Sequence, residues 1–188
     1  MDRQKSIWFW RLIFAGLFLA LVWLANYWQP LHKLAVKSQP GLYQVSEVYD
    51  GDTITVDMLG QTETVRLIGV DTPETHHPNR PVQCFGAQAA TYTKQLLLNQ
   101  RVRLEADALN TDRDRYDRLL RYVYLDDQLV NELLIGQGYG LAYTHFPFSK
   151  VSHFVAREKL ARQAQKGLWA ACQIIIEPNS GRHTNPVN

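Results

Sequence analysis

The stretch LYQVSEVYDGDTITVDML, residues 42–59, alternates apolar and polar residues on both sides of an Asp-Gly-Asp turn. Such alternation is typical of two antiparallel strands joined as a hairpin. Further strand-like runs follow at 63–70, 101–109 and 118–130. Helical spacing of apolar residues predicts helices at 85–98, 129–138 and 149–169, the last capped by Ser149. Five short strands with helices inserted late predict an α+β fold built on a five-stranded β-barrel of the OB type.

The first thirty residues have a different character from the rest. From Ile7 to Trp28 the chain reads IWFWRLIFAGLFLALVWLANYW, with aromatic residues near both ends of an apolar block. The length and the aromatic flanks predict a transmembrane signal-anchor at 7–28, with residues 1–6 in the cytoplasm. A cleaved signal peptide and a buried core helix remain as alternatives. The match to a signal peptidase site is poor, because Trp23 lies where a small residue is expected.

The remaining chain divides into three parts. Residues 29–41 contain two prolines and no clear period, which indicates a linker. Residues 173–188 end in EPNSGRHTNPVN, which lacks core-forming residues, and are expected to be a mobile tail. The working domain is therefore 42–172, which carries 14 Lys and Arg residues against 16 Asp and Glu residues. This slightly negative domain would have to bind nucleic acid through a local patch or a bound cation.

The chain has two cysteines, Cys84 and Cys172. An even pair behind an export segment is consistent with one disulfide formed in an oxidising compartment. Two unrelated buried thiols are the alternative. The sequence has no CxxC pair or Cys/His cluster of the kind that binds zinc.

Two short stretches carry acidic residues at the ends of strands. Asp52 lies in DGDT between two strands, and GVDTPE follows another strand with Asp71 and Glu74. A closed barrel could bring both stretches to one rim. Asp52, Asp71 and the carbonyl of Thr72 would then offer oxygen ligands to a hard cation, which favours Ca²⁺ over zinc. Each stretch alone is more often a hairpin turn or a helix start.

Two arginines complete this chemistry. Arg66 lies on the strand that leads to GVDTPE, and Arg118 opens the strand RLLRYVY. Guanidinium groups match the phosphate oxygens that gain charge when a phosphodiester is attacked. A carboxylate such as Glu74 can orient or deprotonate the attacking water. The combination therefore predicts phosphodiester hydrolysis, although a lone arginine on a strand is more often only solvated.

The domain resembles the staphylococcal nuclease, or thermonuclease, family. The similar stretches are VYDGDTITV, VRLIGVDTPET, FGAQAATYTKQLL, DRYDRLLRYVY, LVNELLIGQGYGLAY and AQKGLW, in the order of the family, between about 45 and 170. The resemblance implies a five-stranded OB barrel with three helices. It also implies Ca²⁺-dependent hydrolysis of DNA and RNA with little sequence preference, leaving 3′-phosphate ends.

The resemblance also implies roles for individual residues. Asp52, Asp71 and Thr72 match calcium ligands, Glu74 the carboxylate that positions water, and Arg66 and Arg118 the phosphate-binding arginines. Arg115 and Tyr116 match positions near the terminal phosphate of a bound nucleotide, and Tyr143 matches a tyrosine against the nucleotide.

Two departures from the family pattern stand out. Asp117 replaces a glycine before Arg118 and brings a carboxylate that could weaken the pull of this arginine on phosphate. His145 and Phe146 replace a tyrosine-lysine pair, so the contacts on the base side differ from those of the family.

The sequence thus predicts a monomeric, calcium-dependent nuclease, anchored in the membrane through 7–28, with its catalytic domain outside the cytoplasm. Cleavage of the N-terminal segment would make it a secreted enzyme. The substrate would be DNA, RNA or both, and no protein partner is implied. The alternative is a non-catalytic nucleic-acid-binding module on the same barrel, tethered to the membrane. The retained acidic residues and arginines argue against that alternative.

Overall fold

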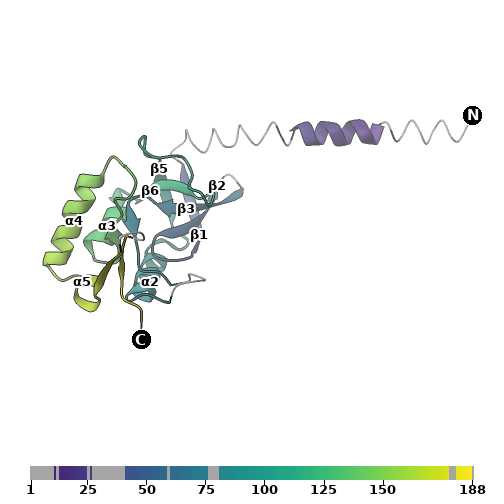
Figure 1. The fold of residues 1–188 in the computed structure, drawn as a ribbon. Helices are drawn as coiled ribbons and strands as arrows, with labels where there is room; N and C mark the ends of the chain where they lie inside the picture. The colour runs from purple at the N-terminus through teal and green to yellow at the C-terminus, as the bar shows by residue number, and fades with distance from the viewer. Residues whose placement is uncertain are drawn as a thin grey trace, which may run out of the picture. The chain divides into compact units, whose positions relative to one another are not determined.

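A computed structural model describes residues 11, 13–24, 26, 41–58, 60–75, 81–177 and 181–187. The chain divides into two compact units, Met1–Gln39 and Pro40–Asn188. The second unit holds the predicted barrel and every candidate site residue, and it is shown with its helices in Figure 1.

The centre of the second unit is a five-stranded barrel, as the strand pattern predicted. The strands are β1 (Leu42–Val48), β2 (Thr53–Met58), β3 (Gln61–Leu67), β5 (Arg101–Glu105) and β6 (Leu119–Leu125), and the short β7 (Gln128–Leu129) pairs antiparallel with the end of β6. Neighbours pair antiparallel in the order β3-β2-β1-β5-β6, and β3 closes the barrel by pairing parallel with β6. The parallel pair brings Val65 opposite Leu119 and Arg66 opposite Leu120.

The apolar residues of the alternating pattern fill the barrel. Val45, Ile54, Val65, Val102 and Leu119 come from five different strands, and each is 0% exposed. Side chains that alternate along a strand point to opposite faces, so the apolar half of each strand faces this common core. The alternation in the sequence therefore encodes the barrel directly.

Helices cover part of the barrel. These are α2 (Gly86–Leu97), α3 (Val130–Gly136), α4 (Val151–Gln163) and the four-residue α5 (Leu168–Ala171). Figure 1 shows α3 and α4 together on one side of the barrel, with α2 at another side. A separate short antiparallel pair is formed by β4 (Val70–Asp71) and β8 (Leu141–Ala142).

The third predicted helix differs from expectation at both ends. Ser149 does not cap α4, because its hydroxyl donates to Asp107 Oδ2 at 2.6 Å and Lys150 holds the cap position without a side-chain bond. The helix also stops at Gln163, and α5 is separate. Gly167 lies between them with φ of 56°, a backbone conformation that an α-helix cannot contain.

The expected mobile tail is instead an ordered hairpin. Strands β9 (Ile174–Glu177) and β10 (Gly181–Thr184) pair antiparallel, with Ile174 opposite Thr184. Thr184 is 0% exposed, and Arg182 forms an ion pair with Glu158 of α4 at 3.0 Å. The prediction relied on the polar sequence from Glu177 onward, whereas the tail is held by polar bonds to the domain and by Ile174, which packs against a buried apolar cluster that includes Leu168 and Trp169.

The two cysteines are joined, which confirms the predicted disulfide. Cys84 precedes α2 and Cys172 follows α5, and the bond closes a loop with a sequence separation of 88. It ties the loop before α2 to the start of the C-terminal hairpin. Cross-linking a loop of this length restricts the unfolded chain strongly.

The N-terminal unit is described only in part. Residues 11, 13–24 and 26 are helical. Among the residues described, none of the helices has the length and apolar character needed to cross a membrane. The predicted anchor at 7–28 lies only partly within the described residues. The predicted cytoplasmic segment 1–6 and the linker 29–41, apart from residue 41, lie outside them.

We expect the Cys84→Ser/Cys172→Ser double variant to unfold at a clearly lower denaturant concentration. The loop-closure estimate for this separation is a loss of about 4–5 kcal/mol in the free energy of unfolding. Urea titration followed by tryptophan fluorescence measures the loss. Reducing the wild type with dithiothreitol should move its curve onto that of the double variant, and an unchanged midpoint would contradict the prediction.

Candidate active site

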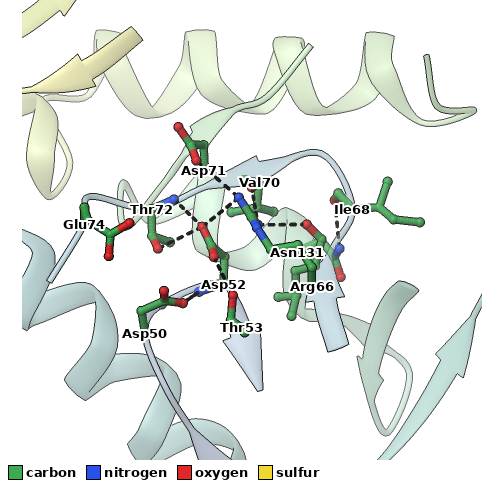
Figure 2. Close-up of polar contacts among 12 residues, drawn as sticks. Asp50, Asp52, Thr53, Arg66, Ile68, Val70, Asp71, Thr72, Glu74 and Asn131 are labelled. Atoms are coloured by element: carbon green, nitrogen blue, oxygen red, sulfur yellow. Dashed lines mark hydrogen bonds and ion pairs between the residues drawn. The ribbon is translucent and has the colours of Figure 1, made fainter. Parts of the chain in front are cut away.

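Asp52 is the centre of the candidate site. It precedes β2 at the end of the Asp-Gly-Asp turn and is 4% exposed. Its Oδ2 accepts hydrogen bonds from the Thr72 N–H at 2.7 Å and from the Thr72 hydroxyl at 3.0 Å. Its Oδ1 accepts from the Thr53 hydroxyl at 3.2 Å. Figure 2 shows how this one carboxylate joins the β1–β2 turn to the loop after β4.

Arg66 holds two carboxylates at once. Its Nη2 lies 3.1 Å from Asp52 Oδ2 and 3.2 Å from Asp71 Oδ1 (Figure 2). Its Nη1 donates to the carbonyls of Val70 at 2.7 Å and Leu67 at 3.2 Å. Burial alone would lower the pKa of Arg66, but the charges of Asp52 and Asp71 raise it above its ordinary value. The guanidinium is therefore a fixed positive charge between the two predicted cation ligands.

Asp50 is a third carboxylate of this cluster, which the sequence analysis missed. Its Oδ1 accepts the N–H of Asp52 at 3.1 Å. Burial and the charge of Asp52 raise the pKa of Asp50 to about 7, although Arg66 acts in the opposite direction. Its spacing of two residues from Asp52 was a usable signal, but an Asp-Gly-Asp stretch is so common in turns that only one aspartate was selected.

The turn that carries these aspartates is held from two sides. A Cβ on Gly51 would meet the Thr72 side chain at 2.7 Å, so a glycine is needed for the turn to approach this loop closely. From the other side, the hydroxyl of Thr93 in α2 donates to the Gly51 carbonyl at 2.8 Å. Helix α2 therefore helps to position the turn that carries Asp50 and Asp52.

Asn131 in α3 secures the turn that follows β3, where it contacts Ile68 (Figure 2). It is 0% exposed, and its side chain accepts the Val123 N–H at 2.8 Å and donates to the Ile68 carbonyl at 2.9 Å. This buried amide links β6 to the turn between β3 and β4. It thereby fixes the strand register that orients Arg66.

Arg118 lies at the start of β6 and is held by Asp114. Its Nε and Nη2 lie 2.8 Å and 2.7 Å from Asp114 Oδ2, and its Nη1 donates to the Thr53 hydroxyl at 3.4 Å. Asp114 Oδ1 also accepts the N–H groups of Tyr116 at 2.9 Å and Arg118 at 3.0 Å. Sequence reasoning missed Asp114, because one acidic residue among several in RDRYDR carries no distinguishing pattern.

Asp117 does not lie against Arg118 as expected. Its φ is 63°, which agrees with a turn that favours glycine and tolerates aspartate. Its side chain is 84% exposed, and its Oδ1 lies 3.6 Å from Nε of Arg113. The extra carboxylate therefore pairs with Arg113, while Asp114 engages Arg118.

A cavity of about 690 Å³ opens beside these arginines. Its lining includes Arg66, Asp71, Arg115, Tyr116, Arg118 and Tyr143. Tyr116 is 63% exposed, and the guanidinium groups of Arg115 and Arg118 lie 4.7 Å and 5.3 Å from its ring centre. The cavity thus combines positive charge with an accessible aromatic face.

The aromatic wall of this cavity includes Tyr143 and Phe146, and His145, the other residue of the replaced pair, stacks on Tyr143. The ring of Tyr143 stacks on His145 at 5.5 Å and lies 6.1 Å from Phe146, which is 61% exposed. Burial and the charge of Asp71 raise the pKa of Tyr143, so its phenol stays neutral. Exposed aromatic rings of this kind provide stacking surfaces for bases.

Glu74 lies at a second cavity, of about 530 Å³, whose lining also includes Asp50, Thr53 and Arg118. Its carboxylate accepts the N–H of Thr75 at 3.2 Å. Arg118 lines both cavities, so it connects the two. The catalytic, cation and nucleotide residues selected from the sequence therefore line these two cavities, except Asp52, which contacts Arg66, and Thr72, which donates to Asp52.

The donor set is compatible with a hard cation. Asp52 and Asp71 both contact the single guanidinium of Arg66, so negative charge is in excess, and all the donors are oxygens. Among the described residues, no group of three or more His, Cys, Asp or Glu side chains is arranged as a complete metal cage. The carboxylates would supply part of a coordination shell, and water would supply the rest.

Comparison with known proteins identifies related sequences. Residues 64–171 match the family described as staphylococcal nuclease homologue. A thermonuclease of Staphylococcus intermedius is 43% identical over 141 residues, which cover 74% of this chain and 83% of that protein. A thermonuclease of Staphylococcus hyicus is 43% identical over 129 residues, or 68% and 75%. Endonuclease YncB of Bacillus subtilis (strain 168) is 38% identical over 138 residues, or 71% and 65%.

We expect Asp114→Asn to destabilise the protein at neutral pH but not in acid. Burial raises the pKa of Asp114, but hydrogen bonds from Arg118 and Tyr116 outweigh it, so the pKa falls below its ordinary value of 3.8. A lowered folded-state pKa contributes stability that is present above pH 3.8 and is lost as the pH falls through the folded-state value. Urea unfolding of both proteins between pH 3 and 8 should show a gap of about 1–2 kcal/mol that closes in acid.

Asp117→Asn is the matched control, because it changes the same charge three residues away in the same turn. The ion pair of Asp117 with Arg113 is exposed and longer, so losing it should change the free energy of unfolding little at any pH. If both variants had the same free energy of unfolding at every pH, the Asp114–Arg118 contact would not contribute the predicted stability.

Proposed function

The chain belongs to the staphylococcal nuclease family, and on this basis we propose that it is a calcium-dependent enzyme that hydrolyses DNA and RNA with little sequence preference. It is a hydrolase of the thermonuclease type. The cation, the range of substrates and the 3′-phosphate ends of the products are the features that we propose beyond this class of enzyme. The observation that carries it is the Asp52–Arg66–Asp71 cluster, with Arg118 and Glu74 lining adjoining cavities.

In this proposal Asp52, Asp71 and the carbonyl of Thr72 hold the cation, which when bound polarises a phosphoryl oxygen. The hydrogen bonds from Thr72 to Asp52 support this assignment, because they bring the two ligand-bearing segments within 2.7 Å of each other. An all-oxygen, partly hydrated site suits Ca²⁺, whose coordination is flexible.

Glu74 is the general base of the proposed mechanism. It takes a proton from a water molecule that attacks the phosphorus atom. The new bond joins the water oxygen to phosphorus, and the bond from phosphorus to the 5′ oxygen breaks. The 5′ oxygen leaves with a proton supplied by solvent, so the products are a 3′-phosphate and a 5′-hydroxyl. The position of Glu74 in one cavity with Arg118 supports this role.

Arg66 and Arg118 stabilise the charge that develops on the phosphate oxygens. Each is already restrained by carboxylates, Arg66 by Asp52 and Asp71, and Arg118 by Asp114. A guanidinium that is fixed before the substrate arrives loses less conformational entropy on binding. The carboxylate contacts therefore serve to preorganise the two arginines.

Arg115, Tyr116 and Tyr143 bind the nucleotide beside the scissile phosphate. Tyr116 and Phe146 are more than half exposed, so unpaired bases have access to their rings. Because the domain carries a slight negative charge, affinity for nucleic acid depends on this local group and on the bound cation.

The enzyme acts outside the cytoplasm as a monomer in this proposal. The Cys84–Cys172 disulfide supports an oxidising compartment. Anchoring through residues 7–28, or release after cleavage of this segment, follows from the sequence alone. Calcium at extracellular concentration would be sufficient for a weak, open site.

The test is a calcium titration of cleavage, with single-stranded and double-stranded DNA and RNA compared side by side. Activity should require Ca²⁺ and disappear in EGTA. Arg66→Ala, Arg118→Ala and Glu74→Gln should each lower kcat by orders of magnitude. Arg103→Ala is the control, since Arg103 stacks on Tyr124 at 3.9 Å in the barrel wall, and it should cleave like the wild type.

Two outcomes would contradict the proposal in different ways. Full activity in EGTA would remove calcium from the mechanism. Nucleic-acid binding without cleavage, unchanged in Glu74→Gln, would instead support the non-catalytic binding module.

A further inference from the structure

We propose that Gln83 is the positioning residue of Glu74 and that the C-terminal hairpin β9–β10 holds Gln83 in place. This inference rests on the proposed role of Glu74 as the general base. It gives the C-terminal segment, which the sequence suggested was a loose tail, a direct function in catalysis.

Gln83 satisfies both backbone groups of Glu74. Its side-chain Oε1 accepts the N–H of Glu74 at 2.9 Å, and its own N–H donates to the Glu74 carbonyl at 2.9 Å. Gln83 is 6% exposed. A Cβ on Gly86 would meet the carbonyls of Glu74 and Pro73 at 2.9 Å, so the start of α2 packs tightly against the same loop. The backbone of Glu74 is therefore held by the segment before α2.

That segment is in turn paired with the C-terminal strand. Gln83 forms a β-bridge with Pro186, and the N–H of Cys84 donates to the Asn185 carbonyl at 2.7 Å. The hydroxyl of Thr184 donates to the Cys84 carbonyl at 2.7 Å. In Figure 1 the C-terminal strand runs down beside α2 to the end of the chain. Residues 184–187 thus lie alongside the segment 82–84, joined to it by an isolated bridge and by backbone hydrogen bonds.

The hairpin is fastened to the domain at two further points. The disulfide joins Cys84 to Cys172, immediately before β9. In β10, Arg182 donates to the carbonyl of Ala142 at 2.7 Å and contacts both carboxylate oxygens of Glu158 at 3.0 Å and 3.1 Å. The hairpin cannot shift without disturbing these contacts, so it is a rigid support for Gln83.

The second fastening point is also close to the cation ligands. Ala142 in β8 pairs with Val70, and the adjacent Leu141 pairs with Asp71. The hairpin therefore contacts the site on two sides, through Gln83 to Glu74 and through Ala142 to the strand that carries Asp71. A general base displaced by about 1 Å can cost two orders of magnitude in rate, so support of this kind has a measurable effect.

The experiment uses the full chain, saturating Ca²⁺ and single-stranded DNA, with kcat and KM measured separately for each variant. Gln83→Ala should lower kcat by about 10–100-fold and leave KM within about twofold, because the substrate-binding residues are unchanged. Gln83→Glu keeps an oxygen that accepts the Glu74 N–H, so it should restore most of kcat. Its added negative charge should move the acidic limb of the pH–rate profile to higher pH.

Two further variants separate the hairpin from general stability. Ile176→Ser changes a residue of β9 that is 74% exposed and should leave kcat unchanged. Thr184→Val removes the hydroxyl that donates to Cys84 and should lower kcat in the same direction as Gln83→Ala, with the folded fraction checked by circular dichroism.

The inference and the proposed function fail in different ways. If the wild type does not cleave, or if Glu74→Gln cleaves as well as the wild type, the proposed function is wrong. If the wild type cleaves and Glu74→Gln does not, but Gln83→Ala retains kcat within twofold, the inference alone is overturned. A loss in Gln83→Ala that Gln83→Glu does not restore would also overturn it.

Discussion

The carboxylate of Asp52 is the interaction on which the site depends. One of its oxygens accepts two hydrogen bonds from Thr72 and contacts Arg66, and the other accepts from Thr53. These partners come from β2, from β3 and from the loop after β4. A buried carboxylate is costly unless it is paired and hydrogen-bonded, so the three segments must meet for the fold to be stable. The contact that secures the fold is therefore the same contact that assembles the candidate catalytic residues.

Around this contact, several arginines are paired with acidic side chains. Arg66 is surrounded by aspartates, Arg118 is held by Asp114, and Arg113 lies with Glu63 and Asp117. Arg66, Arg113 and Arg118 are each oriented by at least one acidic neighbour, whereas the contacts of Arg115 are with Tyr116. Such pairing lowers the net charge of the region while keeping individual guanidinium groups fixed and accessible to phosphate. This arrangement reconciles a slightly acidic domain with a polyanionic substrate.

The parts of the structure that the sequence predicted depend on short-range patterns. Alternation predicted the five strands, and the order of the stretches selected candidate site residues, Asp52, Arg66, Asp71 and Arg118, that lie close together in the structure. The parts that it missed depend on contacts between distant residues. Asp114 differs from the neighbouring acidic residues only in its distance to Arg118, and Ser149 was assigned as a cap because its real partner, Asp107, lies far away in the sequence. The C-terminal hairpin was missed for the same reason, since polar bonds to Cys84, Ala142 and Glu158 have no compositional signature.

The parallel pairing of β3 with β6 has a consequence for the timing of activity during synthesis. Arg66 and the residues next to Arg118 are joined only when this pair forms, and the two strands are separated by β5 and α2 in the chain. Contacts between such distant segments form late, after the cost of closing the intervening loop has been met. A growing or half-folded chain consequently lacks the arrangement of the two guanidinium groups on which the proposed cleavage depends.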